Sequence, residues 1–535
     1  MGSSAPRPSG SARREHWLAL AFFCLLVSSR LPGIREASAR LILNVDELEL
    51  TLSCVDRLLG VPSTSLAWPA GTLQFFALPA IALQGLLAGV LSPSPRGLVG
   101  FAAATYSSPW GALSSVRLVV TLISSAGLTS LAYAFAKRTE SPALPYAVVF
   151  LFAALPVVWC HSHMAMADAV ALGLALAAFA AAEWEAGDAG ALCSGACLGL
   201  ALAAKFPSAV LIPLVLARLL EGPSERRRRV LMFGASLVIA LLLGCPYLWT
   251  DPLRLAKSLA GNLVRGDDPA GLGATLIALA RYAGPLLLAA LAGIALLALR
   301  RRYVLLTGLV LSLGVGILPL ARSGYVVDRY YLPVLAVCIV AACAVATDAA
   351  TQGWFQAARL RWLLLIFPAA LLAVVDLRGY QNLTAELLVP QRARIEVAKS
   401  VCEKPAGTRV FAPHELLPLV APCASKVSLS RIARRARENL ARGESTLALA
   451  GPSLGADFVS VFSSALSEDE QAFAARTTAM SFGKGGKIEL HLFGAAPEQA
   501  RFAVHSEDRA MKALAAGEVD MVARTPVFRA GSRAP

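Results

Sequence analysis

Three carboxylates stand close together near the N-terminus, within residues 44–49 of sequence NVDELE. They follow an apolar run, and an acid beside a membrane can act as a general base or as a metal ligand. Asp46, Glu47 and Glu49 are therefore candidates for proton transfer or ion binding. The structural alternative is a solvated loop whose acids cap the next helix.

Further ionisable residues lie at the ends of apolar runs, where such side chains are functional candidates by default. They are His161, His163, Asp168, Lys205, Arg322, Asp328 and Arg329. The cations among them could hold an anionic phosphate at the membrane surface. The structural alternative for each cation is a side chain that extends from a helix end towards water. His161 and His163 are two residues apart and do not share a helix face, which disfavours a two-histidine metal site.

The composition predicts that these residues belong to a membrane protein. Of the 535 residues, 56% are hydrophobic and only 16% are charged, whereas a soluble domain carries roughly 25% charged residues. The net charge of +14 would suit nucleic-acid binding in a soluble protein. Here the basic residues cluster between apolar runs without an accompanying nucleic-acid module, so we predict no nucleic-acid partner.

Eleven apolar runs are candidate membrane crossings, which need roughly 20 residues each, although the two runs on either side of Lys205 are short. They are residues 17–34, 116–136, 144–160, 165–183, 189–203, 206–220, 230–249, 274–299, 303–320, 330–347 and 360–377. Residues 73–106, which contain three prolines, could form two crossings or helices lying in the interface. The first run could also be a signal peptide, but charges between it and the Ala-Ser-Ala at 37–39 favour an uncleaved helix.

The basic clusters test this topology. With a cytoplasmic N-terminus and an even number of crossings in 73–106, they all fall inside, as the positive-inside rule requires. These clusters are Lys137-Arg138, Arg226 to Arg229, Arg300 to Arg302, and Arg359 with Arg361. The chemistry-bearing residues then fall on the outer face, which predicts an outward-facing active site near the lipid headgroups.

The sequence thus predicts an all-α polytopic membrane domain of about 11–13 transmembrane helices, followed by a small extracytoplasmic α/β domain. Residues 1–12 are expected to be disordered, residues 13–377 to form the membrane domain with an outer loop at 35–72, and residues 378–535 to be a periplasmic soluble domain. Short alternating apolar stretches, among them 407–411 and 487–493, predict its strands. Cys402 and Cys423 could pair there, but their spacing alone cannot decide it.

A family pattern connects these features. Its elements here are Asp46-Glu47, Trp68-Pro69, Arg117 opening its span, residues 156–168, Gly199 to Lys205, and Arg329-Tyr330-Tyr331-Leu332-Pro333. In this order they resemble the C-type membrane glycosyltransferases, nearest to the protein O-mannosyltransferase and aminoarabinose-transferase branch. The resemblance covers residues 17–377. A second proline and a preceding His or Lys, usual beside Pro69 in the family, are missing, which puts substrate contacts of that loop in doubt.

The resemblance implies transfer, usually with inversion, of a sugar from a polyprenyl-phosphate donor to an acceptor hydroxyl. Carried over, Asp46 is the general base and Glu47 supports or orients it. Arg329 is the first choice to stabilise the departing lipid phosphate, with Lys205 and Arg322 behind it. Glu49, His161, His163, Asp168 and Arg117 remain further candidates.

The resemblance leaves several points open. It implies membrane lipids as partners and the bacterial inner membrane as location, but it names neither the sugar nor the acceptor, which could be a protein, a lipid or a glycan. No metal ligands or certain cofactor are assigned, and a divalent metal stays open because some relatives use one. The competing prediction is a multi-pass transporter or flippase with a periplasmic appendage, although few charges lie mid-span and no two related halves are evident.

Overall fold

The protein divides into two units by its internal contacts. The first comprises Met1–Arg35, Ser63–Ala77 and Val116–Leu383, and the second comprises Glu36–Pro62, Leu78–Ser115 and Thr384–Pro535. The computed structural model describes residues 9–38, 46–58, 71–89, 101, 105, 109–139, 142–184, 187–221, 225–253, 255–257, 271–323 and 328–351, and strand residues 410–411, 479–482, 487–491, 502–506 and 521–522. Predictions for residues 68–69 and 360–377, Cys402 and Cys423 lie outside them.

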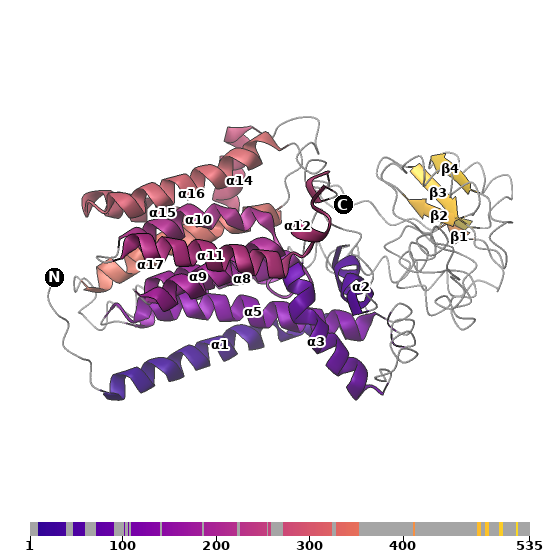
Figure 1. The fold of residues 1–535 in the computed structure, drawn as a ribbon, viewed down its shortest axis with the longest axis horizontal. Helices are drawn as coiled ribbons and strands as arrows, with labels where there is room; N and C mark the ends of the chain where they lie inside the picture. Colours follow the sequence, from indigo (N-terminus) through magenta and orange to yellow (C-terminus); the bar gives the residue numbers. More distant parts are fainter. Residues whose placement is uncertain are drawn as a thin grey trace, which may run out of the picture. The chain divides into compact units, whose positions relative to one another are not determined.

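Helices account for nearly all of the described secondary structure before residue 352 (Figure 1). They are α1 (Ser9–Ser38), α2 (Asp46–Leu58), α3 (Gly71–Leu87), α5 (Trp110–Ala136), α6 (Ala143–Ala154), α7 (Pro156–His161), α8 (Ala167–Trp184), α9 (Asp188–Ala204), the 3-10 helix η1 (Phe206–Leu211), α10 (Ile212–Leu220), α11 (Arg226–Gly244), α12 (Tyr247–Thr250), α14 (Leu272–Ala283), α15 (Pro285–Leu299), α16 (Tyr303–Arg322), the 3-10 helix η2 (Asp328–Tyr331) and α17 (Leu332–Thr351).

The helices of the first unit lie side by side as a bundle, with α5, α8, α9 and α11 along one another in Figure 1. Small residues permit the closest approaches. A Cβ atom on Gly127 of α5 would collide with the carbonyl oxygen of Gly173 in α8, and one on Gly173 would lie 2.6 Å from the carbonyl oxygen of Ile123. Such small-residue contacts let helix backbones meet, as they do in membrane bundles.

Several helices have the length and composition of membrane spans. Among the described residues, three are long and apolar enough to cross a membrane, namely Trp110–Ala136, Tyr303–Arg322 and Asp328–Asp348, and a bent pair brings the number to four if it forms one span. Four further apolar helices are 10–17 residues long. An all-α domain with three or four helices long and apolar enough to cross a membrane is therefore confirmed, and the larger number of crossings stays a prediction.

The bent pair corrects the straight helix expected at residues 274–299. The structure has α14 and α15 instead, bent by 105°. The break lies at Gly284, whose φ of 51° suits glycine, and at Pro285, which cannot donate a helical hydrogen bond. The pair still runs along the bundle once: Gly271 N donates to Ala321 O at the end of α16, and Arg302 at the end of the pair precedes the start of α16.

The basic clusters that the structure describes, those at 137–138, 226–229 and 300–302, gather at one end of the bundle. Arg138, after α5, pairs at 2.5 Å with Glu183 in the last turn of α8, and Arg228, at the start of α11, pairs at 2.6 Å with Asp188 at the start of α9. Arg302 pairs with Glu221, which follows α10. This shared end agrees with the expected grouping of the clusters, whose membrane side stays a prediction.

The second unit contains α2 and short strands. The segment expected as an acidic loop is helical from Asp46 onward, so Asp46, Glu47 and Glu49 occupy the first turn of α2. Acidic residues in the first turn stabilise a helix because they interact with its dipole. The strands are β1 (Val410–Phe411), β2 (Ala479–Phe482), β3 (Lys487–His491), β4 (Phe502–Ser506) and β5 (Met521–Val522). β2, β3 and β4 form an antiparallel sheet, and β1 pairs with β5 in parallel. β1 and β3 fall within two of the predicted stretches.

Candidate functional site

Lys205 projects from a break between two helices. α9 ends at Ala204, and Lys205 is extended, with φ of −159° and ψ of 119°, before η1 begins. Pro207 follows two residues later and cannot continue the hydrogen-bonding pattern of α9. The chain therefore turns at Lys205, and its side chain leaves the helix end and extends into the bundle instead of following a helical face.

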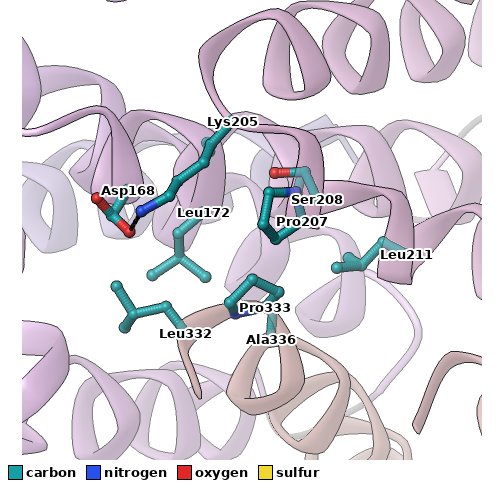
Figure 2. Close-up of a pocket in the computed structure, with 11 residues that line it drawn as sticks. Asp168, Leu172, Lys205, Pro207, Ser208, Leu211, Leu332, Pro333 and Ala336 are labelled. Atoms are coloured by element: carbon teal, nitrogen blue, oxygen red, sulfur yellow. Dashed lines mark hydrogen bonds and ion pairs between the residues drawn. The ribbon is translucent and has the colours of Figure 1, made fainter. Parts of the chain in front are cut away.

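Asp168 receives the ammonium group of Lys205. The carboxylate lies in the first turn of α8, and its Oδ1 pairs with Lys205 Nζ (Figure 2). The Asp168 and Lys205 side chains are only 5% and 7% exposed. Removing two charges from water is costly, and a buried pair persists only where each group keeps its partner. The pair therefore fixes the break after α9 against the start of α8.

Tyr330 joins this pair to a third segment. Lys205 Nζ lies 5.1 Å from the centroid of the Tyr330 ring, and Arg329 Cζ lies 5.8 Å from the same centroid. Arg329 and Tyr330 belong to η2, immediately before α17. Cations within about 6 Å of an aromatic centroid are attracted to it. The ring thus holds two cations from separate segments near each other.

Asp328 and His161 complete the cluster. Asp328 Oδ2 lies 3.3 Å from His161 Nε2 at the end of α7, and its Oδ1 accepts a 2.7 Å hydrogen bond from the backbone N of Arg329. The charges that act most strongly on Asp168 are those of Lys205, Arg329 and His161. We refer to Asp168, Lys205, Asp328, Arg329, Tyr330 and His161 as the α8–η2 cluster.

His163 lies deep beside the cluster. Its ring meets that of Trp159 edge-on, with centroids 4.3 Å apart. Burial lowers the pKa of His163 well below its usual 6.5, and the charges of Arg117 and Arg30 lower it further. Thr121 and Ser124, on the same helix as Arg117, donate hydrogen bonds to Ser162 O at 3.3 Å. His163 is therefore a neutral, packed residue at physiological pH.

The cavity at the cluster is small. About 10 Å³ is enclosed between α8, the break after α9 and the start of α17, with Asp168, Lys205, Ser208, Leu332 and Pro333 among its walls (Figure 2). That volume holds about one water molecule. In this arrangement the pair is closed to anything larger.

The structure brings together five of the residues selected from sequence: His161, Asp168, Lys205, Asp328 and Arg329. Arg117 and His163 interact beside them. Arg322 is exposed at the end of α16. Asp46, Glu47 and Glu49 belong to the second unit, and of these side chains only that of Glu47 is described; it is fully buried.

Sequence reasoning missed Ser208 and the start of α3. Ser208 shares the cavity wall, and the Phe-Pro-Ser sequence directly after Lys205 could have indicated a helix break there. Thr72 Oγ1 donates to Leu200 O at 2.7 Å, and a Cβ on Gly71 would collide with Gly244 O. The segment that follows the predicted Trp68-Pro69 motif thus packs at the Lys205 end of α9.

The residue types that commonly bind metal ions do not cluster among the described residues. Within the described ranges no three His, Cys, Asp or Glu side chains are grouped so that they could hold a metal ion. Comparison with known proteins adds no assignment, because no family model and no curated protein matches the chain.

Proposed function

We propose that the protein is a membrane glycosyltransferase that moves a sugar from a polyprenyl-phosphate donor to an acceptor hydroxyl. The α8–η2 cluster is the observation that carries this proposal. It gathers two cations at one end of a helical bundle, from segments that share only their position at the ends of apolar runs. A lipid phosphate is an anion confined to the membrane surface, where the ends of apolar runs lie, and positioned cations stabilise it.

Arg329 and Lys205 bind the phosphate in this proposal. Asp168 holds the Lys205 ammonium in place, and Asp328 fixes the backbone of Arg329 through its 2.7 Å hydrogen bond. Because the cavity has room for only about one water, the phosphate has to approach from the rim. Lys205 then turns one of its three N–H donors from Asp168 towards the phosphate.

The reaction breaks one bond and forms one. The acceptor oxygen attacks the anomeric carbon while the bond from that carbon to the phosphate oxygen breaks, and its electron pair leaves with the phosphate. The acceptor proton passes to a carboxylate, for which the sequence resemblance proposes Asp46, with Glu47 in support. Negative charge grows on the leaving phosphate, where Arg329 and Lys205 act.

The proposed orientation in the membrane rests on the difference between the two ends of the bundle. α8 carries Asp168 in its first turn and Glu183 in its last turn, and its 18 residues extend about 27 Å. That length is close to the hydrocarbon thickness of a bilayer. With the basic clusters cytoplasmic, the α8–η2 cluster faces the periplasm of an inner membrane, and the N-terminus is cytoplasmic. We also propose that residues 378–535 are periplasmic.

The proposal is tested by sugar transfer from polyprenyl-phosphate donors to a panel of acceptors, using purified protein in lipid. Arg329→Gln and Lys205→Gln are each expected to lower the transfer rate by roughly 10²–10³-fold, and Asp46→Asn by roughly 10²–10⁴-fold. Lys257→Gln is the matched control, since Lys257 is an exposed lysine that follows α12. Equal rates for Lys205→Gln and Lys257→Gln would remove Lys205 from the site.

A transporter or flippase is the second candidate, and two helix breaks favour it. Discontinuous helices often form transport sites, and this bundle has one break at Lys205 and another at Gly284. Lys205, however, lies at the bundle end and not halfway along it. Accumulation of a lipid or solute by proteoliposomes, with no covalent transfer from any donor, would favour this candidate over the glycosyltransferase.

A further inference from the structure

A second and larger cavity lies at the opposite end of the bundle from the α8–η2 cluster. Its volume is about 140 Å³. The walls come from the C-terminal parts of α5, α8, α15 and α17 and from α10 and α16. Its apolar walls are Phe135, Phe179, Leu214, Leu297, Leu305, Leu309, Val340, Ala341 and Ala344. An apolar cavity of roughly this size takes up a molecule as large as benzene, so this one has room for about six carbons of an acyl chain.

Charged side chains surround the cavity. Arg138, Glu183, Arg302 and Asp348 line it together with the apolar residues. Arg138 and Arg302 reach the surface, with side chains 37% and 42% exposed, whereas Glu183 is only 6% exposed. The site thus combines an apolar interior with a polar rim, which matches an amphiphile and not a purely apolar molecule.

The carboxylates of the rim do not use all the donors of its arginines. Arg138 uses Nη1 and Nη2 on Glu183, at 2.5 Å from Oε1 and 2.7 Å from the backbone oxygen. Arg302 uses Nε and Nη2 on Glu221. A guanidinium has five N–H donors. Within the described part of the chain, Nε of Arg138 and Nη1 of Arg302 remain available to an anion.

The rim has an excess of positive charge. The cations paired with its carboxylates are Arg138, Arg218, Arg300 and Arg302, four against the three carboxylates Glu183, Glu221 and Asp348. Burial lowers the pKa of Arg138, which Glu183 raises and the charges of Arg218 and Arg302 lower again. The cations therefore lie close enough to repel one another, and a bound anion would relieve that repulsion.

We propose that this cavity binds one anionic phospholipid, with part of one acyl chain between Phe135, Phe179 and Leu309 and its phosphate at Arg138 and Arg302. Basic pockets between transmembrane helices are suited to anionic headgroups. The site is separate from the proposed donor site, because Glu183 and Asp168 lie at opposite ends of α8. The lipid would join α5, α8, α16 and α17 at the end where their charges meet.

Titration of detergent-purified protein, followed by native mass spectrometry, tests the site. The probes are phosphatidylglycerol and phosphatidylcholine with identical acyl chains. We expect one saturable phosphatidylglycerol per chain, bound more tightly than phosphatidylcholine. Two matched pairs of variants locate it: Arg302→Gln beside Arg301→Gln, and Ala344→Leu beside Ala295→Leu. Arg302 and Ala344 line the cavity, whereas Arg301 and Ala295 are exposed and do not.

Arg302→Gln should weaken phosphatidylglycerol binding about five-fold, from the loss of one cation near the headgroup. Ala344→Leu should weaken it about ten-fold or more, because the added carbons occupy the place of the chain. Equal losses for Arg302→Gln and Arg301→Gln would overturn the proposal in favour of diffuse surface charge. Equal affinity for both lipids, or unchanged binding by a folded Ala344→Leu protein, would also overturn it.

Discussion

The contact between Asp168 and Lys205 makes the sharpest test of the candidate site. Both side chains are almost fully buried. Removing one partner of such a pair costs about 3–5 kcal/mol, because it leaves the other charge buried and uncompensated. We therefore expect Lys205→Met and Asp168→Asn each to lower the free energy of unfolding by an amount in that range.

The two variants should lose different amounts of unfolding free energy. Without Lys205, Asp168 keeps Arg329 and His161 as electrostatic neighbours. Without Asp168, Lys205 and Arg329 both remain within about 6 Å of the Tyr330 ring, so two cations stay close with less compensation. Asp168→Asn should therefore cost more than Lys205→Met, near the upper end of the range.

The double variant measures the contact itself. Asp168→Asn with Lys205→Met removes both charges, so its loss should fall short of the summed single losses by about 2–3 kcal/mol. Reversible unfolding in mixed micelles, followed by circular dichroism, gives the four free energies. The exposed pair Glu225 and Arg228 is the control, and its cycle with Glu225→Gln and Arg228→Met should give less than about 1 kcal/mol. Additive losses at Asp168 and Lys205, within about 0.5 kcal/mol, would refute the pairing.

Three further predictions concern packing, charge and pH. Gly127→Ala should lower the melting temperature in detergent because its Cβ collides with Gly173 O, whereas Gly234→Ala, which meets nothing within 4 Å, should stabilise α11 by about 0.5–1 kcal/mol. Glu183→Gln should cost about 3 kcal/mol or more in micelle unfolding because it leaves Arg138 and Arg218 without their shared carboxylate, and the exposed Glu225→Gln about 0.5 kcal/mol or less; equal effects would contradict the role of Glu183. Since the folded pKa of His163 lies below its unfolded value near 6.5, unfolding protein takes up a proton, and stability should fall by up to about 1.4 kcal/mol per pH unit below pH 6.5. A His163→Gln protein with the same pH dependence as wild type would contradict this assignment.

Much of the helical domain could be predicted because each long apolar run has few alternatives to a helix in a membrane. The run at 189–203 is α9 within a residue at either end, and the run at 206–220 is η1 with α10. The bend at Gly284 was missed, since composition stays apolar across it and only the Gly-Pro pair marks it. The acidic segment at 46–49 was expected as a loop, but it forms the first turn of the helix α2.

The members of the candidate site were predictable, but their contacts were not. Each of the three charged residues Lys205, Asp168 and Arg329 is predictable as a candidate because it lies at the end of an apolar run. Asp168 and Lys205 are 37 residues apart, and which carboxylate receives Lys205 depends on how α8 and α9 pack. The sequence likewise groups the basic clusters at one bundle end, but it does not reveal that Glu183 receives two arginines or that a cavity opens beside them.

The central claim is sugar transfer coupled to release of the lipid phosphate. The most direct test incubates wild-type protein in lipid with radiolabelled polyprenyl-phosphate sugars and follows both products in one reaction. We predict that labelled acceptor and polyprenyl phosphate appear in equal amounts for at least one sugar, at a rate that Arg329→Gln lowers strongly. Folded protein that forms neither product from any donor and acceptor in the panel would contradict the account.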